Sequence, residues 1–373
     1  MKKILLTDCC ELVMGQSPVS SSYNTEKRGL PFYQGNADFG KINPITRCWC
    51  DKPIKIAYKD DILISVRAPI GAINIASEEC CIGRGLAAVR ALKGKCLYEF
   101  LYYALQSNTE ELKSQGTGST FKAISKQILA NSELPDITLE EQHRIVNRLL
   151  KVDTLIENAN EQLRLFDQLV KSRFLELFGD LKLNDKKWEV KFFKDLTLLI
   201  TDGEHSTPRR TDNGIYLLSA RNVLNHSLQL NDIDYIDEVE YERISKRIQP
   251  MIGDVLLSCS GSVGRCCAIT KDIKFQMVRS VALLRFKAEI NPVFAEYMIV
   301  SDYLQEQINS NKTASSQSNL FQGKIKMLKG VIPPLDLQNQ FADFVEEVNK
   351  SKFTHCYELL LLIIKKIWYN NYV

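Results

Sequence analysis

The sequence contains no long hydrophobic run. In its 373 residues, no apolar run comes close in length to the ~18 consecutive apolar residues that a membrane-spanning helix requires. The apolar run Leu359–Ile364 is ended by Lys365 and Lys366, and the run Ile4–Leu6 near the start stops before Asp8. The second run is too short for the core of a signal peptide. We therefore predict a cytoplasmic protein without a membrane segment.

Metal-ligand spacing is also missing. The chain has 11 cysteines and 4 histidines, but it contains no two Cys-x2-Cys knuckles of the kind that hold zinc. The cysteines stand as adjacent pairs such as Cys9–Cys10 and Cys80–Cys81, as one Cys-x-Cys, and singly. Isolated thiols of this kind are typical of buried, reduced core residues. We expect no metal and no cofactor on this chain.

Catalytic motifs are absent in the same way. An adenine methyltransferase needs an Asn/Asp-Pro-Pro-aromatic loop around the flipped base, and the nearest sequences, Asn43–Thr46 and Asn291–Phe294, lack the second proline. The segment Gly116–Ser119 is rich in glycine, but no Gly-Lys-Ser/Thr follows it as in a phosphate-binding loop. The acidic residues of Asp232–Glu242 alternate with apolar ones, as on a half-exposed strand and turn. The chain is therefore not expected to be an enzyme.

The charge is small and unevenly spread. The formal net charge is +3, and the stretches 1–137 and 181–334 each carry a small excess of Lys and Arg. The stretches 138–180 and 335–373 have a small excess of Asp and Glu. Basic globular parts joined by acidic helices suit a DNA-binding protein whose helices face another protein.

The strongest feature is an internal repeat. Asp61–Ser65 (DILIS) returns as Asp254–Ser258 (DVLLS), and a glycine follows each segment six residues later. Ile124–Gln142 aligns with Leu320–Gln338 without a gap, and three further blocks keep the same order. Each copy has about 130 residues of short apolar strands broken by Gly, Asn, Asp and Pro, followed by a long helix. The sequence therefore predicts an α+β protein with two similar domains.

Both long helices show an apolar seam. In the first helix the apolar positions alternate in spacings of four and three: Ile145, Leu149, Val152, Ile156, Ala159, Leu163, Phe166 and Val170. Such spacing is typical of a coiled coil. Thr138 with Glu141 forms a capping-box pattern at its start, and Gly179 is placed to end it. The second seam is less regular: Phe341, Val345, Val348, Lys352, Cys356, Leu359, Ile363 and Ile367. Its last part is nearly all apolar, which indicates a surface for a partner.

Taken together and in this order, these segments resemble the specificity subunit of type I DNA restriction-modification systems over essentially the whole chain. The resemblance rests on the helix entry Leu139–Ile145 (LEEQHRI), its weaker copy Pro334–Phe341 and the helix exit Phe174–Asp180. It also rests on Gly253–Ser258 with its following glycine, and on the loop Thr201–Pro208 (TDGEHSTP).

The resemblance implies two target-recognition domains, 1–137 and 181–334, each reading one half of a bipartite, asymmetric DNA site. The helices 138–180 and 335–373 would form an antiparallel coiled coil that acts as a spacer. It further implies double-stranded DNA, two methyltransferase subunits and motor-nuclease subunits as partners. S-adenosylmethionine, ATP and magnesium would be bound by those partners and not by this chain.

Candidate DNA contacts lie in polar loops and basic turns, because phosphates and base edges are bound by amides, hydroxyls and cationic side chains. Gly116–Lys122 and Lys312–Asn319 are either solvated loops or DNA-facing loops, and Thr207–Thr211 is either surface or a phosphate-binding turn. Arg221 and Asn222 have the chemistry to contact guanine and adenine, and Gly35 and Asn36 take their place in the first repeat. The candidate residues are Gln16, Asn36, Arg67, Thr117, Ser119, Lys122, His205, Arg209, Arg210, Arg221, Asn222, Arg265, Lys312, Ser316 and Asn319.

Two arginines are left out of this set. Arg84 and Arg279 are flanked by apolar residues, so we expect each to form a structural salt bridge and not to contact DNA.

Two other classes of protein remain as alternatives. The first is a stand-alone DNA methyltransferase or endonuclease, which purified protein would reveal by modifying DNA. The second is a coiled-coil scaffold without a DNA function, which would bind no DNA even with its partners.

Overall fold

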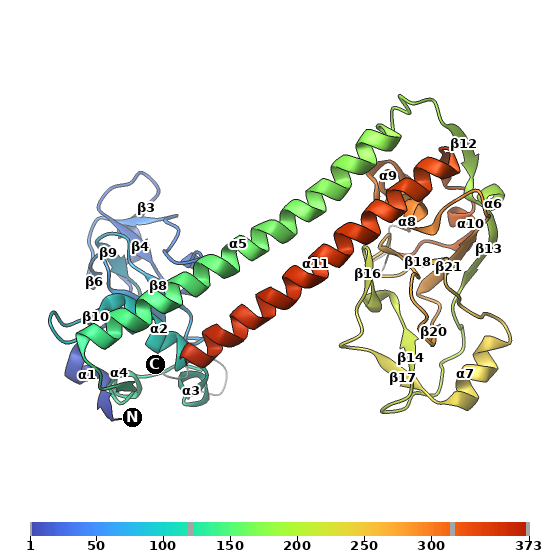
Figure 1. The fold of residues 1–373 in the computed structure, drawn as a ribbon. Helices are drawn as coiled ribbons and strands as arrows, with labels where there is room; N and C mark the ends of the chain where they lie inside the picture. The colour runs from blue at the N-terminus through green and yellow to red at the C-terminus, as the bar shows by residue number, and fades with distance from the viewer. Residues whose placement is uncertain (1, 118–121, 314–317, 371–373) are drawn as a thin grey trace. The chain divides into compact units, whose positions relative to one another are not determined.

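The computed structural model describes residues 2–117, 122–313 and 318–370. The chain divides into two compact units (Figure 1). Unit 1 consists of Met1–Glu161 with His355–Val373, and unit 2 consists of Gln162–Thr354. The long helices α5 (Leu139–Phe178) and α11 (Leu335–Asn370) each contribute one part to either unit. Among the described helices, none is both long and apolar enough to cross a membrane.

Unit 1 is built on a four-stranded antiparallel sheet in the order β2-β10-β7-β8. A five-stranded sheet in the order β3-β5-β4-β9-β6 lies in the same unit, and its β4 and β9 pair in parallel. The strands are β1 (Lys3–Leu5), β2 (Cys10–Met14), β3 (Tyr23–Asn24), β4 (Leu30–Tyr33), β5 (Trp49–Cys50), β6 (Ile56–Ala57), β7 (Ile62–Ser65), β8 (Ile73–Ile75), β9 (Cys80–Ile82), β10 (Leu86–Ala91) and β11 (Glu133–Pro135). The short helices are α1 (Leu6–Cys9), α2 (Tyr98–Ser107), α3 (Thr109–Ser114) and α4 (Lys126–Ala130), with the 3-10 turns η1 (Ser20–Ser22) and η2 (Asn36–Asp38).

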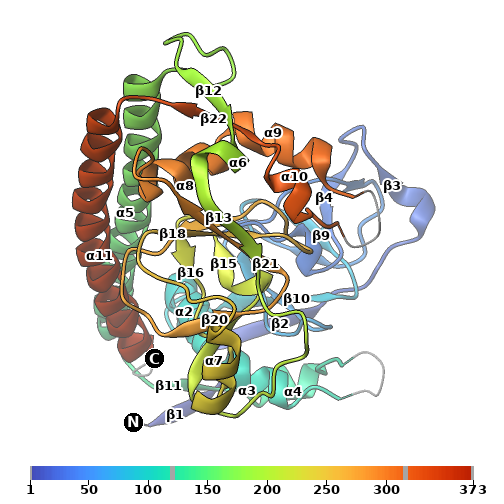
Figure 2. The same cartoon turned by 90° about the vertical axis from the view of Figure 1, so that its right-hand side faces the viewer.

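Unit 2 repeats this plan (Figure 2). Its main sheet has the order β13-β21-β18-β19, and its second sheet, β17-β14-β20, again contains one parallel pair, β14 with β20. The strands are β12 (Glu189–Phe192), β13 (Thr197–Asp202), β14 (Ile215–Leu218), β15 (Val223–Leu224), β16 (Ser227–Leu228), β17 (Asp234–Ile236), β18 (Asp254–Ser258), β19 (Cys266–Ala268), β20 (Phe275–Met277), β21 (Val281–Phe286) and β22 (Lys329–Ile332). The short helices are α6 (Phe193–Leu196), α7 (Glu238–Ser245), α8 (Pro292–Val300), α9 (Asp302–Asn311) and α10 (Gln322–Ile325), with the 3-10 turn η3 (Ala220–Asn222). The matching sheet orders confirm the predicted repeat and the mixed α+β class.

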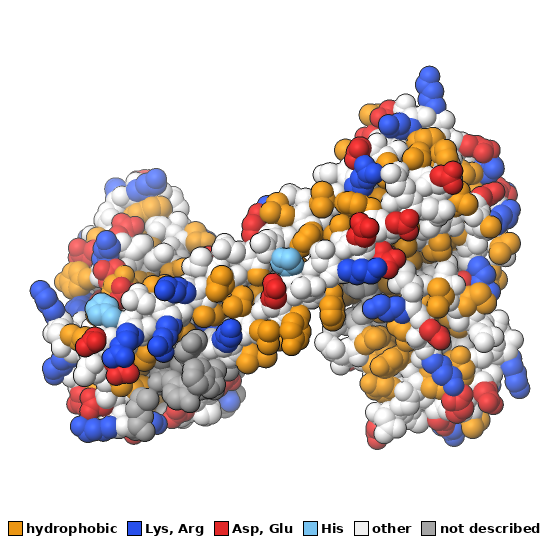
Figure 3. All heavy atoms as spheres, viewed as in Figure 1, with side chains coloured by type: hydrophobic (Ala, Val, Ile, Leu, Met, Phe, Trp, Pro, Cys, Tyr) orange, Lys and Arg blue, Asp and Glu red, His pale blue; other side chains and the backbone are white. Residues whose placement is uncertain are grey.

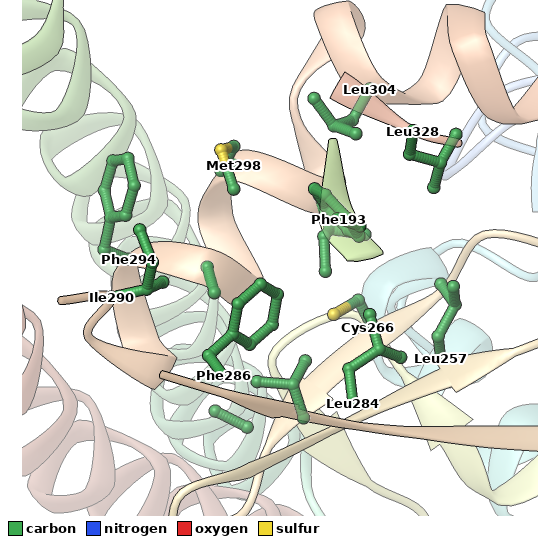
Figure 4. Close-up of a cluster of buried hydrophobic side chains, with 14 of the residues drawn as sticks. Phe193, Leu257, Cys266, Leu284, Phe286, Ile290, Phe294, Met298, Leu304 and Leu328 are labelled. Atoms are coloured by element: carbon green, nitrogen blue, oxygen red, sulfur yellow. The ribbon is translucent and has the colours of Figure 1, made fainter. Parts of the chain in front are cut away.

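The repeated apolar strand is buried on both of its faces. In β18, Val255 and Leu257 belong to one core cluster, while Leu256 between them belongs to another. Successive side chains of a strand point to opposite faces. The middle of a strand covered on both faces must therefore be apolar, as Val255–Leu257 is, and Ile62–Ile64 of the equivalent β7 follow the same rule. Figure 4 shows the larger unit 2 cluster, in which residues of the sheet, α8 and α9 point toward one another.

A buried glutamine connects each long helix to its domain. The Gln142 amide oxygen accepts a hydrogen bond from the Leu97 backbone N–H (2.9 Å), and its Nε2 donates to the Lys95 carbonyl (3.1 Å). Gln338 makes the equivalent bonds in unit 2, to the Asn291 N–H (2.8 Å) and the Glu289 carbonyl (3.1 Å). These contacts explain why the Leu-x-x-Gln motif occurs at both helix starts.

The helix ends and the first seam agree with the sequence predictions. Thr138 Oγ1 accepts from the Glu141 N–H (3.3 Å), and Gly179 follows the last turn with a φ of +72°, a conformation that favours glycine. All eight seam positions of α5 are buried or half-buried. In α11 the seam prediction was wrong at Cys356 and Ile363, which are exposed. Lys352 and Leu359 of the predicted seam are half-buried, as are His355, Leu362 and Lys366, and the side chain of Ile367 lies outside the described part of the chain.

Candidate nucleic-acid interface

The ends of four strands meet around one turn in unit 1. The turn Gly83–Gly85 follows β9, and its first N–H donates to the Tyr33 carbonyl at the end of β4 (2.8 Å). The Gly85 carbonyl accepts from the Val66 N–H just after β7 (2.9 Å). Beyond β2, the Gln16 N–H donates to the Ile82 carbonyl (3.0 Å). We call this surface face 1, formed by Gln16, Gln34–Asn36, Arg67, Gly83–Gly85, Thr117 and Lys122.

Face 1 requires a glycine where its segments cross. A Cβ atom on Gly85 would lie 2.4 Å from the Gln34 carbonyl oxygen, closer than any real Cβ contact. Backbone segments can therefore approach closely only because this residue has no side chain. This close packing of loops places polar and cationic residues next to one another at the strand ends.

The described ends of the predicted loop Gly116–Lys122 belong to face 1. Isolated bridges pair Ala123 with both Arg67 and Thr117, and the Ala68 N–H donates to the Lys122 carbonyl (3.1 Å). Arg67, Thr117 and Lys122 are therefore neighbours, and all three are exposed. Gln16 is exposed and Asn36 is half-buried on the same face. Ser119 lies outside the described residues.

Unit 2 forms an equivalent surface, face 2, from the same strand ends. The Glu204 N–H donates to the Met277 carbonyl (2.8 Å), and the Val278 N–H donates to the Leu218 carbonyl (2.9 Å). The Leu320 N–H, directly after the polar loop Lys312–Asn319, donates to the Cys259 carbonyl (2.9 Å). Face 2 is formed by Glu204–His205, Ser219–Arg221, Ser260, Val278–Ser280, Thr313 and Ser318–Asn319.

The candidates of the polar loop in unit 2 are largely held by the protein itself. The Asn319 N–H donates to Thr313 Oγ1 (3.0 Å), and its Oδ1 accepts from Ser260 Oγ (2.6 Å). Lys312 Nζ donates to Asn309 Oδ1 (2.8 Å) at the exposed end of α9. Ser316 lies outside the described residues.

The loop Thr201–Pro208 is braced by Arg247, which lies just after α7, and by its own side chains. The Arg247 guanidinium donates to the Asp202 and Gly203 carbonyls (2.6 and 2.5 Å). The hydrogen bond from Ser206 Oγ lowers the pKa of Glu204, and nearby arginines, first Arg243, lower it further. Glu204 is thus held ionised, as a hydrogen-bond acceptor near the strand ends. His205 is exposed, with Nε2 2.9 Å from Asp202 Oδ2.

Three candidate arginines of unit 2 are paired with carboxylates. Arg209 pairs with Asp237, and Arg210 Nε lies 3.0 Å from Asp234 Oδ2. Arg221 lies 3.1 Å from the other oxygen of Asp234. All three guanidinium groups are exposed, but their charge is balanced locally, which weakens their attraction to phosphate.

The prediction for Asn222 was wrong. Its side chain is fully buried, and its Oδ1 accepts from the N–H and the hydroxyl of Ser219 (both 2.9 Å). Its Nδ2 donates to the carbonyls of Gln229 (3.0 Å) and Asp232 (2.9 Å). All the bonding capacity of the amide is used inside the fold, so Asn222 orders its loop and presents nothing to a base. In the first repeat Asp38 takes this place: its Oδ2 accepts from the Gln34 N–H.

Arg67 and Arg265 are not equivalent residues. Arg67 follows β7 and corresponds to Ser260, because both pair with the polar loop. Arg265 is half-buried; its carbonyl accepts from the Ser258 N–H, and its own N–H donates to Ser258 Oγ. In unit 1 the residue equivalent to Arg265 is Ala72, whose carbonyl accepts from the Ser65 N–H. The two repeats therefore place these cations at different positions.

The predicted salt bridges of Arg84 and Arg279 were also wrong. Both side chains are exposed, and among the described residues neither forms an ion pair or a side-chain hydrogen bond. Each lies at the central turn of its face. The neighbouring arginines Arg90 and Arg285 form the structural pairs instead, with Asp61 and Asp254. The repeat held a signal for Arg84 and Arg279, since both copies retain an arginine at this position.

Among the residues that the structure describes, one group of side chains has the spacing to hold a metal ion. The Sγ atoms of Cys9, Cys10 and Cys96 all lie within 4.8 Å of one another and are buried. In unit 2 the equivalent positions hold Leu196, Thr197 and Ile290. Because the same fold fills this place with a largely apolar set, packing is a sufficient reason for the three thiols.

Comparisons with known proteins follow the same division of the chain. The model of the type I restriction modification DNA specificity domain matches residues 1–165 and again 185–355. The putative type I restriction enzyme MjaX specificity subunit of Methanocaldococcus jannaschii is 47% identical over 147 residues, which are 39% of this chain and 35% of that protein. The match thus spans about a third of that relative's length.

Two more relatives are similar over most of the chain. The type I restriction enzyme EcoBI specificity subunit of Escherichia coli is 21% identical over 375 residues, covering 93% of this chain and 78% of that protein. The type I restriction-modification S subunit of M. genitalium has the same fold, with a TM-score of 0.58, 17% identity and coverage of 99% and 94%. On the two matches of the domain model, this chain belongs to the family of type I restriction modification DNA specificity domains.

Proposed function

We propose that this chain is the DNA-recognition subunit of a type I restriction-modification complex and has no catalytic centre of its own. The observation that carries the proposal is the repetition of one polar loop surface, face 1 and face 2, in a chain with two DNA specificity domains. Each face would read one half of a bipartite, asymmetric site in double-stranded DNA. The candidates that remain exposed on these loops would supply the contacts.

A domain exchange tests this assignment. Residues 1–137 are taken as the first recognition domain, 138–180 and 335–373 as spacers, and 181–334 as the second domain. Replacing 1–137 by the domain of a relative should change one half of the methylated sequence and leave the other half unchanged, as read by methylome sequencing. A change in both halves would show that the domains do not read independently.

We also propose that α5 and α11 form an antiparallel coiled coil that sets the gap between the two half-sites. In unit 1, Asp153 of α5 lies 2.6 Å from Lys366 of α11. In unit 2, Asp167 pairs with Lys352. The two carboxylates are two heptads apart, as are the two lysines, which supports a common antiparallel register.

The spacer role is tested by lengthening both helices. One heptad inserted after Ala159 and one after Glu358 keep both ion pairs and add about 10 Å of helix. The preferred gap should grow by about three base pairs at ~3.4 Å per step, with both half-sequences unchanged. An unchanged gap in a stably folded variant would refute the spacer.

The same helices would dock the catalytic partners. The part of α11 in unit 1 carries exposed apolar side chains, among them Tyr357 (58% exposed), Leu360 (52%), Leu361 (41%) and Ile364 (52%). Figure 3 shows such side chains gathered along the helices. Apolar patches of this kind mark protein interfaces. Two methyltransferase subunits and motor-nuclease subunits would bind here and would carry S-adenosylmethionine, ATP and magnesium.

A further inference from the structure

Arg84 and Arg279 occupy the same place in the two faces. Each follows the strand that pairs in parallel within its second sheet, β9 in unit 1 and β20 in unit 2. The residue before each arginine donates its N–H to the end of the parallel partner strand (2.8 and 2.9 Å). The carbonyl of the residue after it accepts from the segment that follows β7 or β18 (2.9 and 2.8 Å). The backbone pattern therefore makes Arg84 and Arg279 equivalent without reference to sequence alignment.

Neither guanidinium has a structural role in the described part of the fold. Both side chains are exposed, and within the described ranges no carboxylate and no hydrogen-bond acceptor contacts them. Other arginines differ in this respect: Arg210 and Arg221 pair with Asp234, and Arg285 forms a bidentate pair with the buried Asp254 (2.7 and 2.8 Å). An unpaired guanidinium has five free donors and a permanent charge, and it binds phosphate in bidentate geometry.

We propose that Arg84 and Arg279 are phosphodiester contacts common to the two faces, while the positions at which the faces differ read the bases. This inference rests on the proposed function. Two different half-sites share no base sequence, but both present the same sugar–phosphate backbone. A residue that is the same in both faces therefore matches the backbone, because phosphate contacts carry no sequence information.

The neighbouring positions differ between the faces. Gln16 corresponds to Glu204, because each donates its N–H to the last residue of the equivalent strand. Arg67 corresponds to Ser260, through the equivalent bridge to the polar loop. Glutamine suits adenine, a carboxylate accepts from the cytosine amino group, and arginine suits guanine. These positions have the chemistry to tell one half-site from the other.

Salt-dependent binding tests the assignment. The full chain is titrated by fluorescence anisotropy onto a mixed-sequence duplex of about 30 base pairs at several KCl concentrations. Each phosphate contact contributes about 0.9 to the slope of log K against log salt. Arg84→Gln and Arg279→Gln should each lower the slope by about one, and the double variant by about two. Arg28→Gln is the matched control: it removes the same charge from an exposed arginine that pairs with Glu26 (3.1 Å) and belongs to neither face, and its slope should stay near that of the wild type.

Lysine variants separate phosphate from base contact. Arg84→Lys and Arg279→Lys keep the charge but lose the bidentate fork that guanine recognition needs. They should retain the salt slope, and the methylated sequence in cells should be unchanged. A changed base preference in a lysine variant would overturn the assignment, as would an unchanged slope in the double glutamine variant. A wild-type chain that binds no DNA would overturn the proposed function together with this inference.

Discussion

Gln338→Ala should destabilise unit 2 without touching either face. The side chain is fully buried in the first turn of α11. Its amide accepts from the Asn291 N–H (2.8 Å) and donates to the Pro333 and Glu289 carbonyls (2.8 and 3.1 Å). Alanine removes these three bonds and leaves one N–H and two carbonyls without their partner. At about 1 kcal/mol net for each bond, the free energy of unfolding should fall by about 3 kcal/mol.

Calorimetry of the full chain measures this loss. For a domain of roughly 150–250 residues, about 3 kcal/mol corresponds to a fall in Tm of about 10 °C. Hydrogen exchange should place the loss of protection in unit 2. Gln142→Ala should have a similar effect in unit 1, because Gln142 makes the equivalent bonds.

Gln340→Ala is the matched control, since Gln340 lies two residues further along the same helix and is exposed. This variant should change stability by less than about 0.5 kcal/mol. If Gln338→Ala lowers Tm no more than Gln340→Ala, the reasoning that the motif connects helix and domain is refuted.

Three further predictions concern thiols, a buried ion pair and the docking surface. The exposed Cys356 should react with a thiol reagent well before the buried cysteines. Burial raises the pKa of Cys259, for example, to about 12, so only about one part in ten thousand of this thiol is thiolate at pH 8. Fast labelling of most of the eleven cysteines in the native chain would contradict this prediction. Asp254→Ala should lower the free energy of unfolding, measured in urea, by about 3 kcal/mol, because the Arg285 guanidinium and the Met251 N–H lose their buried acceptor. Removing Arg285 as well should recover part of this loss. Leu360→Glu with Ile364→Glu should abolish copurification with a methyltransferase subunit but leave DNA binding by this chain intact, and unchanged copurification would refute the docking surface.

The fold was predictable where one local pattern decides the outcome. A strand with consecutive apolar residues, such as Val255–Leu257 of β18, is covered on both faces, and the repeat of that strand predicted two similar domains. Thr138 and Gly179 marked the ends of α5 because capping depends on side chains within the first turn and on a positive φ just after the last.

The candidate site was harder to predict, because the burial and the pairing of its side chains depend on residues far apart in the sequence. Arg210 finds its partner Asp234 24 residues away, so its neutralisation is invisible in the local sequence. Asn222 has the chemistry of an adenine contact, but its burial depends on carbonyls of a later loop. The apolar flanks of Arg84 and Arg279 suggested burial, whereas the turn that follows a strand points their side chains outward.

Because unit 1 is built from two distant segments of the chain, it cannot be completed until late in synthesis. Its last segment, His355–Val373, is separated from Met1–Glu161 by the whole of unit 2. Lys366 completes the unit by reaching Asp153 (2.6 Å) and the ring of Tyr103 (5.8 Å). At about 5–20 residues per second, a ribosome needs roughly 10 to 40 s to synthesise the intervening residues. Met1–Glu161 therefore meets the segment that completes its unit only after all of unit 2 has been synthesised, and during that interval the N-terminal half of α5 is open to chaperones or to an early partner.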